Sequence, residues 1–304
     1  MLDPADLYTL EADIPELDGP VLVMALEGFV DAGHAARLAV AALRDGREAR
    51  TVARFDVDQL VDYRSRRPPL RFETDRWAAY TPPALDVVQL TDTAGTRYLL
   101  LAGPEPDVQW ERFAAAVAAL VDTLGVRLVV SMTGIPMAVP HTRPLGVTVH
   151  GTRSELTEGN PAWFGTVEVP GSAAALVEFR LGEKGHDAMG VAAHVPHYLA
   201  RAEYPQVARV LLDHVGLATG LYLPTESLAA AAERAAAAIT AQVASSEEVA
   251  QVVAALERQY DSVAAGRGSP PAAGLGGELP SADELAAEVE KFLAEQDEGP
   301  GGAG

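Results

Sequence analysis

Apolar residues along this chain fall either in short uninterrupted runs or in runs with helical spacing. Residues 20–26 read PVLVMAL, are bounded by Gly19-Pro20 and by Gly28, and are typical of a strand buried on both faces. Residues 34–44 have their apolar positions on one side and Gly46 directly beyond the end, which predicts a helix. Residues 50–55 alternate again. The three segments together therefore predict a βαβ unit.

The same alternation of strands and helices continues to residue 204. Thr93-Ala94-Gly95 separates two apolar runs and predicts a β-hairpin, and residues 110–124 form a strongly amphipathic helix closed by Gly125. The other expected elements are strands at 85–90, 97–101, 126–133, 147–150, 165–169 and 190–194 and a helix at 172–181. Because parallel strands need crossover connections, this order predicts an α/β protein with three α/β/α layers and a mainly parallel central sheet.

The character of the sequence changes after Tyr204. Consecutive helices are expected at 205–215, 225–243 and 247–260, and Ser245 with Glu248 has the spacing of a capping box for the last of them. We therefore expect three parts, which are an α/β core at 1–204, a helical extension packed on the core at 205–262, and a flexible acidic tail at 263–304. The tail ends in a short amphipathic helix, and we expect its apolar face to bind a partner through Leu285, Val289, Phe292 and Leu293.

Composition excludes several classes of function. The chain holds 43 acidic and 23 basic residues, a net charge of -20 that repels nucleic acid and anionic lipid alike. It has no cysteine, which excludes disulfides, thiolate nucleophiles and cysteine-ligated metals. No apolar run reaches the roughly 18 residues of a membrane span, and the acidic N-terminus lacks the basic region of a signal peptide. We expect a cytoplasmic protein without nucleic-acid or membrane contacts.

The first candidate site is the loop where the first strand enters the first helix, a common ligand site in open α/β sheets. Its candidate residues are Glu27, Gly28, Asp31 and Gly33. His34-Ala35 stands where a P-loop has lysine and a hydroxyl residue, and there is no G-x-G-x-x-G motif, so we expect no nucleotide and no cofactor. Asp31 either orients a ligand or caps the helix through its side chain, and we favour the cap.

The second candidate site is the loop predicted after the strand at 126–133. Three prolines stiffen this loop and could present an imidazole and a guanidinium to a carboxylate or phosphate. Its candidate residues are Gly134, Pro136, His141 and Arg143. Arg143 could equally pair with an acidic neighbour, and the sequence does not decide between these readings.

The third candidate site is His194-Val195-Pro196-His197-Tyr198, which offers two imidazoles three residues apart. Pro196 breaks the helical geometry that would place both rings on one face. A zinc site would need a third ligand from His141, Glu27 or Asp31, and we expect no metal. We expect Tyr198 and one histidine to form hydrogen bonds at a helix entrance, with the other histidine facing a pocket or solvent.

Five motifs in order make the chain resemble the proteasome assembly chaperone 2 family, in its actinobacterial branch of uncharacterised members. The resemblance covers roughly residues 5–262 and rests on EGFVDAG, LLAGPEPDVQWERF, GIPMAVPHTRP, GVAAHVPHYLARAEYP and GLATGLYLPTESL. It implies a core similar to nucleoside phosphorylases, homo-oligomers with a trimer favoured, and a link to proteasome assembly. The chain ends Gly-Pro-Gly-Gly-Ala-Gly and lacks the hydrophobic-tyrosine-any-residue tail of archaeal and eukaryotic relatives, which argues against insertion into proteasome pockets.

Two functions from different classes remain open on the sequence. The favoured one is a non-enzymatic assembly or interaction protein, homo-oligomeric and with a small-ligand pocket. The alternative is a small-molecule hydrolase or phosphorylase-like enzyme with Asp31 or Glu27 as base, His141 or His197 as acid, and Arg143 as anion holder. No G-x-S-x-G motif is present, so serine hydrolase chemistry has no local support in the sequence.

Overall fold

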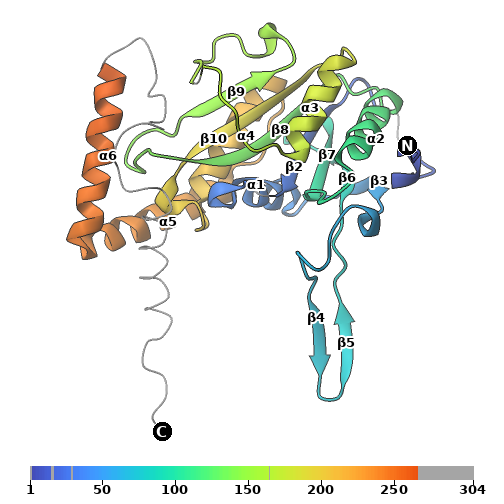
Figure 1. The fold of residues 1–304 in the computed structure, drawn as a ribbon, viewed down its shortest axis with the longest axis horizontal. Coiled ribbons are helices and arrows are strands. Elements are labelled where there is room, and N and C mark those ends of the chain that lie inside the picture. Colours follow the sequence, from blue (N-terminus) through green and yellow to red (C-terminus); the bar gives the residue numbers. More distant parts are fainter. Residues whose placement is uncertain (1, 15–16, 29, 164, 266–304) are drawn as a thin grey trace.

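The protein is built on one eight-stranded sheet with helices on both of its faces (Figure 1). The computed structural model describes residues 2–14, 17–28, 30–163 and 165–265, so the predicted tail helix lies outside the described residues. In spatial order the strands are β1 (Tyr8–Leu10), β3 (Arg50–Phe55), β6 (Asp86–Thr91), β7 (Arg97–Pro104), β2 (Val21–Glu27), β8 (Leu128–Met137), β10 (Ala188–Pro196) and β9 (Val147–Gly151).

The sheet is mixed, and the prediction of a mainly parallel sheet was wrong. β7, β2, β8 and β10 are parallel neighbours at its centre. β1, β3 and β6 on one side and β9 on the other pair antiparallel. The predicted hairpin around Gly95 is confirmed, and it is one of the connections that reverse the strand direction. β3 does not neighbour β2, because β6 and β7 lie between them, so the predicted βαβ unit is not formed by adjacent strands.

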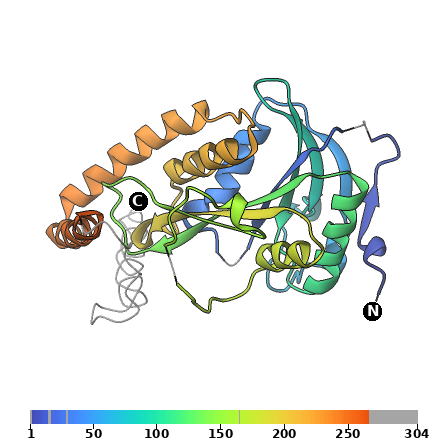
Figure 2. The ribbon, with the colours of Figure 1, turned by 90° about the horizontal axis from the view of Figure 1, so that it is seen from above.

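The central strands bury both faces, as the run at 20–26 predicts. Val21, Val23 and Ala25 face one hydrophobic cluster, whereas Leu22 and Met24 face the other. The first cluster is closed by α1 (Ala35–Arg44), α4 (Pro205–Thr219) and α5 (Glu226–Ser245), and the second by α2 (Trp110–Thr123) and α3 (Ala173–Glu183). Figure 2 shows α4 and α5 on one side of the sheet and α3 on the other. The α/β class with helices on both faces is therefore confirmed.

Three local predictions need correction. Residues 165–169 are not a strand; Val167 and Val169 are exposed and have no sheet to pack against. β8 runs on to Met137, so Gly134 and Pro136 belong to a strand and not to a loop. The N-cap of α6 (Glu247–Ala265) is Ser246, whose hydroxyl accepts from the Val249 amide, because α5 continues through Ser245.

A projecting β-hairpin was not predicted at all. β4 (Leu70–Glu73) and β5 (Arg76–Tyr80) pair with each other and extend away from the body of the molecule (Figure 1). Every residue of the two strands is exposed. Prolines flank the segment at 68–69 and 82–83, and this breaks the pattern by which strands are recognised from sequence.

The helices after residue 204 differ in how deeply they are buried. α4 contributes Val207, Leu211 and Val215 to the first cluster, whereas α6 buries little more than Val253 and Leu256. No helix in the described part of the chain is both long and apolar enough to cross a membrane.

Candidate functional site

A recess lies where β2 and β7 end. These two strands are parallel neighbours, but α1 follows β2 on one face of the sheet and α2 follows β7 on the other. A crevice opens at such a switch point, and open α/β sheets usually bind ligands there. The cavity has a volume of about 690 Å³ and is lined by Glu27, Gly28, Asp31, His34, Arg37, Ser65, Arg66, Glu105, Pro106, Asp107, Trp110, Ala200 and Arg201.

Arg66 ties the ends of the two strands together. Its guanidinium donates to the backbone carbonyls of Glu27 and Glu105 and pairs with the carboxylate of Asp107. The Glu105 amide in turn donates to the Glu27 carbonyl over 2.9 Å. Arg66 therefore forms part of the cavity wall, with its donors already engaged by protein oxygens.

Gly28 leaves room for a buried carboxylate. A Cβ atom at Gly28 would stand 1.9 Å from Oε2 of Glu105, so a larger residue would displace that side chain. Glu105 is only 8% exposed, and its Oε1 accepts from the Ala173 amide at the start of α3 over 2.7 Å. The glutamate thus joins the cavity to the helix layer on the other side of the sheet.

Asp31 acts as the cap that the sequence favours. Its carboxylate accepts from the Ala36 amide over 2.7 Å and from the Arg37 amide over 3.3 Å, at the start of α1. Burial raises its pKa above the ordinary value for an aspartate, and the helix amides act in the opposite direction. The carboxylate lies at the edge of the cavity with its acceptor capacity partly used.

Gly33 and Gly134 allow elements to approach closely beside the cavity. Gly33 has φ +69°, and its amide donates to the Ala200 carbonyl over 2.7 Å. A Cβ at Gly134 on β8 would stand 2.2 Å from the carbonyl oxygen of Ala32. The two glycines allow β8 and the turn at Ala32–His34 to contact each other directly, and this contact fixes the position of the first turn of α1.

The other six predicted site residues do not line this cavity. His141 and Tyr198 instead contact each other, with the Tyr198 hydroxyl 2.7 Å from Nδ1 of His141 and accepting from the His141 amide. His197 stacks edge-on against Tyr198 at 5.4 Å, and burial lowers its pKa. Pro136 lies in β8 opposite Val195, in the sheet ladder. Arg143 also lies outside the cavity, where it pairs with residues of α6.

Arg143 pairs with acidic residues of α6. Its Nε and Nη2 atoms donate to both carboxylate oxygens of Asp261 over 2.8 and 2.7 Å, and Nη1 lies 3.4 Å from Glu257. The neighbouring hydroxyl of Thr142 donates to the same Glu257. Of the two alternatives for Arg143, the structure therefore supports pairing with an acidic neighbour. The contacts of Thr142 and Arg143 in the second predicted site hold α6 against the body of the protein, and we call them the latch.

His194 is a core histidine on β10. It is 1% exposed, its Nε2 lies 2.8 Å from the Thr148 hydroxyl, and Trp163 stacks edge-on at 4.7 Å. Burial lowers its pKa to about 4, so the ring is neutral over the whole physiological range. Across the described residues, no cluster of three or more histidine, aspartate or glutamate side chains is arranged to hold a metal ion.

Comparison with known proteins places the chain in a family. The family model described as PAC2 matches residues 25–243. The chain belongs to the PAC2 family. The unknown-function protein Rv2714 of Mycobacterium tuberculosis is similar to this PAC2 chain, with 45% identity, a TM-score of 0.82, and 96% of this chain and 97% of that one covered. No curated protein matches the sequence.

Two further solved structures resemble this PAC2 protein. A protein of unknown function from Corynebacterium glutamicum is 36% identical, with a TM-score of 0.82, and covers 86% of this chain and 99% of its own. The M. tuberculosis proteasome-assembly chaperone homologue Rv2125 is 28% identical, with a TM-score of 0.70, over 77% of this chain and 99% of its own. The predicted family membership is thus confirmed.

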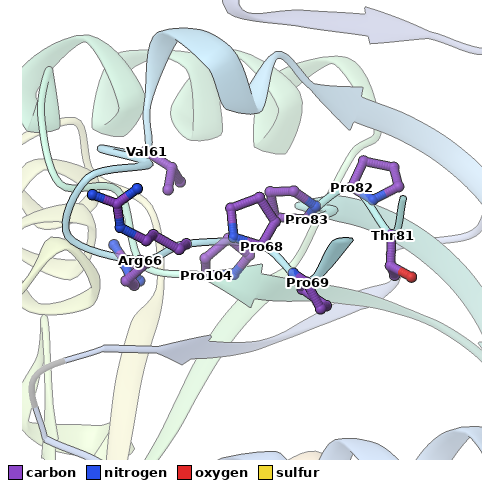
Figure 3. Close-up of a pocket in the computed structure, with 9 residues that line it drawn as sticks. Val61, Arg66, Pro68, Pro69, Thr81, Pro82, Pro83 and Pro104 are labelled. Carbon is purple, nitrogen blue, oxygen red and sulfur yellow. The ribbon is translucent and has the colours of Figure 1, made fainter. Parts of the chain in front are cut away.

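A second, smaller cavity of this PAC2 protein lies at the base of the projecting hairpin. It has a volume of about 310 Å³ and is walled largely by Pro68, Pro69, Pro82, Pro83 and Pro104 (Figure 3). Arg66 borders both cavities, so the larger cavity and the root of the hairpin share a wall. Sequence reasoning missed Arg66 and Glu105, although Glu105 stands within a motif that carries the family resemblance.

Proposed function

We propose that this PAC2 protein is an assembly or interaction protein that works as a homo-oligomer. The observation that carries the proposal is the hairpin formed by β4 and β5. Its large apolar side chains Leu70, Phe72, Trp77 and Tyr80 are 52%, 55%, 66% and 49% exposed. Aromatic side chains of this kind are enriched in the buried centres of protein interfaces.

We infer that a binding partner stabilises the hairpin. An isolated two-stranded hairpin is marginally stable in water, and here it has no other strand or helix to pack against within the described chain. Phe72 and Trp77 stack edge-on at 5.1 Å and form a compact apolar tip region. The prolines at its base restrict the backbone, so the hairpin is presented with less entropy to lose on binding.

Charge is compatible with a second copy of this chain as the partner of the hairpin. The protein as a whole carries -20, whereas residues 70–80 hold two arginines against two carboxylates and are neutral. A neutral, apolar arm can approach the acidic body of another copy without the repulsion that two acidic surfaces would meet. Because each copy offers both an arm and an acidic surface, such contacts can close into a ring, and the family resemblance favours a trimer.

The proposed class of protein partner, which we call the client, comes from the description of a relative. The similar protein Rv2125 is described as a proteasome-assembly chaperone homologue. We carry that description over as a proposal that the client is a multi-subunit protein complex. The finer prediction of a core similar to nucleoside phosphorylases stays a prediction.

Light scattering at micromolar concentration tests the oligomer. The wild-type chain should scatter as a multiple of its 31.9 kDa mass, and a Phe72→Ser, Trp77→Ser double variant should lower that mass. Phe179→Ser is the matched control, because Phe179 is 60% exposed on α3, away from the hairpin. A strictly monomeric wild type would overturn the proposal.

A small ligand in the 690 Å³ cavity is a second candidate function, favoured by the position of the cavity at the switch point. The enzymatic alternative keeps Glu27 and Asp31 in this cavity but loses Arg143 to α6. A thermal-shift screen of nucleosides, sugar phosphates and divalent metals should identify a ligand that raises the melting temperature, and Gly28→Ala should abolish the shift. A screen without any stabilising compound would remove this candidate.

A further inference from the structure

Three strands place a serine, a glycine and a histidine in one row on the face of the sheet that α3 covers. Gly190 of β10 is paired with Ser131 of β8 on one side and with His150 of β9 on the other. On these strands Val129 and Ala188 face the cluster beneath α2 and α3. Because side chains alternate along a strand, Ser131 and His150 lie on that same face.

The missing side chain of Gly190 lets the serine and the histidine face each other. A Cβ atom there would stand 2.4 Å from Nε2 of His150 and 2.9 Å from Oγ of Ser131. Both atoms therefore border the space above Gly190. Within the described part of the chain, the Ser131 hydroxyl donates a long hydrogen bond of 3.5 Å to the Met189 carbonyl. Hydrogen bonds between nucleophile and base are often loose until a substrate is bound.

The opposite edge of the imidazole is held by an acid. Nδ1 of His150 lies 2.8 Å from Oε1 of Glu178 on α3, and this pairing raises the pKa of the histidine. Because a carboxylate oxygen accepts, Nδ1 carries the hydrogen and Nε2 of the neutral ring has a free lone pair. Glu178 is 14% exposed and His150 is 48% exposed, so the acid is shielded while the base can be reached from solvent.

We propose that Ser131, His150 and Glu178 form a serine hydrolase site for carboxylic esters, with Ser131 as the nucleophile, His150 as the general base and Glu178 as the positioning residue. The order serine, histidine, acid across three elements is the arrangement by which a hydroxyl is activated in unrelated folds, recognised by geometry and not by sequence order. This activity is separate from the proposed assembly role and does not use the cavity at β2 and β7.

The chemistry balances with water as the only co-reactant. Oγ of Ser131 attacks the ester carbonyl carbon while its proton passes to Nε2 of His150. The bond to the alcohol then breaks, and the imidazolium returns the proton to the leaving oxygen. Water next attacks the acyl carbon, gives a proton to Nε2 and releases the carboxylic acid, and the proton goes back to Ser131.

Labelling with an alkyl fluorophosphonate tests the site in the full chain. The probe should form a phosphonate ester with Ser131 and expel fluoride, and mass spectrometry of the digested protein locates the modified residue. His150→Gln should lower the labelling rate by about 100-fold or more, the typical contribution of a general base. Ser154→Ala, at a serine in a short surface helix, is the matched control and should label like the wild type.

A second measurement separates positioning from folding. Glu178 is the one charged group that acts on the imidazole of His150 within the described structure, with the Ser131 hydroxyl facing the ring across Gly190. Glu178→Gln should therefore slow labelling at least ~10-fold and move the midpoint of its pH profile to lower pH. The proposal is overturned if wild-type Ser131 is not labelled, or if labelling is unchanged in His150→Gln while the circular dichroism spectrum matches the wild type.

Discussion

Several glycines determine which backbone segments and side chains come into contact in this protein. Gly134 is one such case, because a Cβ there would stand 2.2 Å from the Ala32 carbonyl and 3.0 Å from the Ala35 side chain. We expect Gly134→Ala to lower the free energy of unfolding by about 1–3 kcal/mol, since the backbone of the turn before α1 must move. Urea denaturation measures the change.

The control for that substitution is Gly165→Ala. A Cβ at Gly165 would meet no atom within 4 Å, so this variant should stay within about 0.5 kcal/mol of the wild type. Equal unfolding midpoints for the two variants would show that the close approach at Gly134 relaxes without cost.

A buried histidine makes the stability of the core depend on pH. The pKa of His194 is about 4 in the folded protein, whereas an unfolded histidine takes a proton near pH 6.5. The stability contributed by the neutral ring is therefore complete above pH 6.5 and is lost as the pH falls towards 4, by up to about 3 kcal/mol. In His194→Gln this part of the acid destabilisation should disappear. Melting curves of both proteins between pH 7 and 4.5 that decline in parallel would contradict the assignment.

The sequence predicts contacts within a contiguous motif better than contacts between distant strands. Glu27, Gly28 and Asp31 lie together in the cavity because they follow one another at the end of β2. Ser131, His150 and Glu178 come together only through strand register and the packing of α3, which local spacing does not encode. A local motif such as G-x-S-x-G therefore cannot reveal a group of side chains that is assembled in this way.

Among the elements, α6 is held by polar contacts more than by buried surface. Arg143 pairs with Asp261 and Glu257, and the Tyr260 hydroxyl donates to the Pro144 carbonyl over 3.1 Å. Because exposed ion pairs contribute about 1 kcal/mol or less each, this latch can open locally while the core stays folded.

Removing the latch should loosen α6 alone. In an Asp261→Asn, Glu257→Gln double variant we expect amide hydrogen exchange in α6 to rise by roughly 5-fold. The melting temperature of the core should stay nearly constant. Glu233→Gln on the exposed face of α5 is a control with the same chemical change and no expected effect. Unaltered exchange in the double variant would mean that Val253 and Leu256 suffice to hold the helix.

Helices and strands with one persistent apolar periodicity were predicted well. Features that depend on neighbouring strands, such as strand direction and strand length, were predicted poorly. The helices at α1 and α2 match their predicted limits within a residue, since caps and apolar spacing are local signals. The direction of β9 and the extension of β8 through Pro136 depend on neighbours in the sheet. The hairpin of β4 and β5 escaped because it has no buried face from which a pattern could arise.

For the whole molecule, we expect the hairpin to be dispensable for folding of the body. The Thr81 amide lies 3.4 Å from the Pro69 carbonyl, so a short glycine and serine linker can replace residues 70–80. We expect this deletion to abolish the oligomer while the circular dichroism spectrum of the body is retained. Size-exclusion chromatography with light scattering measures both species, and a deletion variant that keeps the wild-type mass would place the contact elsewhere.

Arg66 lies between the two cavities of this molecule. Its guanidinium donates to the carbonyls of Glu27 and Glu105 at the ends of β2 and β7, and the same residue borders the proline-lined cavity at the base of the hairpin. We therefore expect that a displacement of the hairpin would change the position of Arg66 in the larger cavity. A compound that binds in the cavity and favours one position of Arg66 would then change the association constant of the oligomer. By thermodynamic linkage, association would change the affinity of the protein for that compound by the same factor.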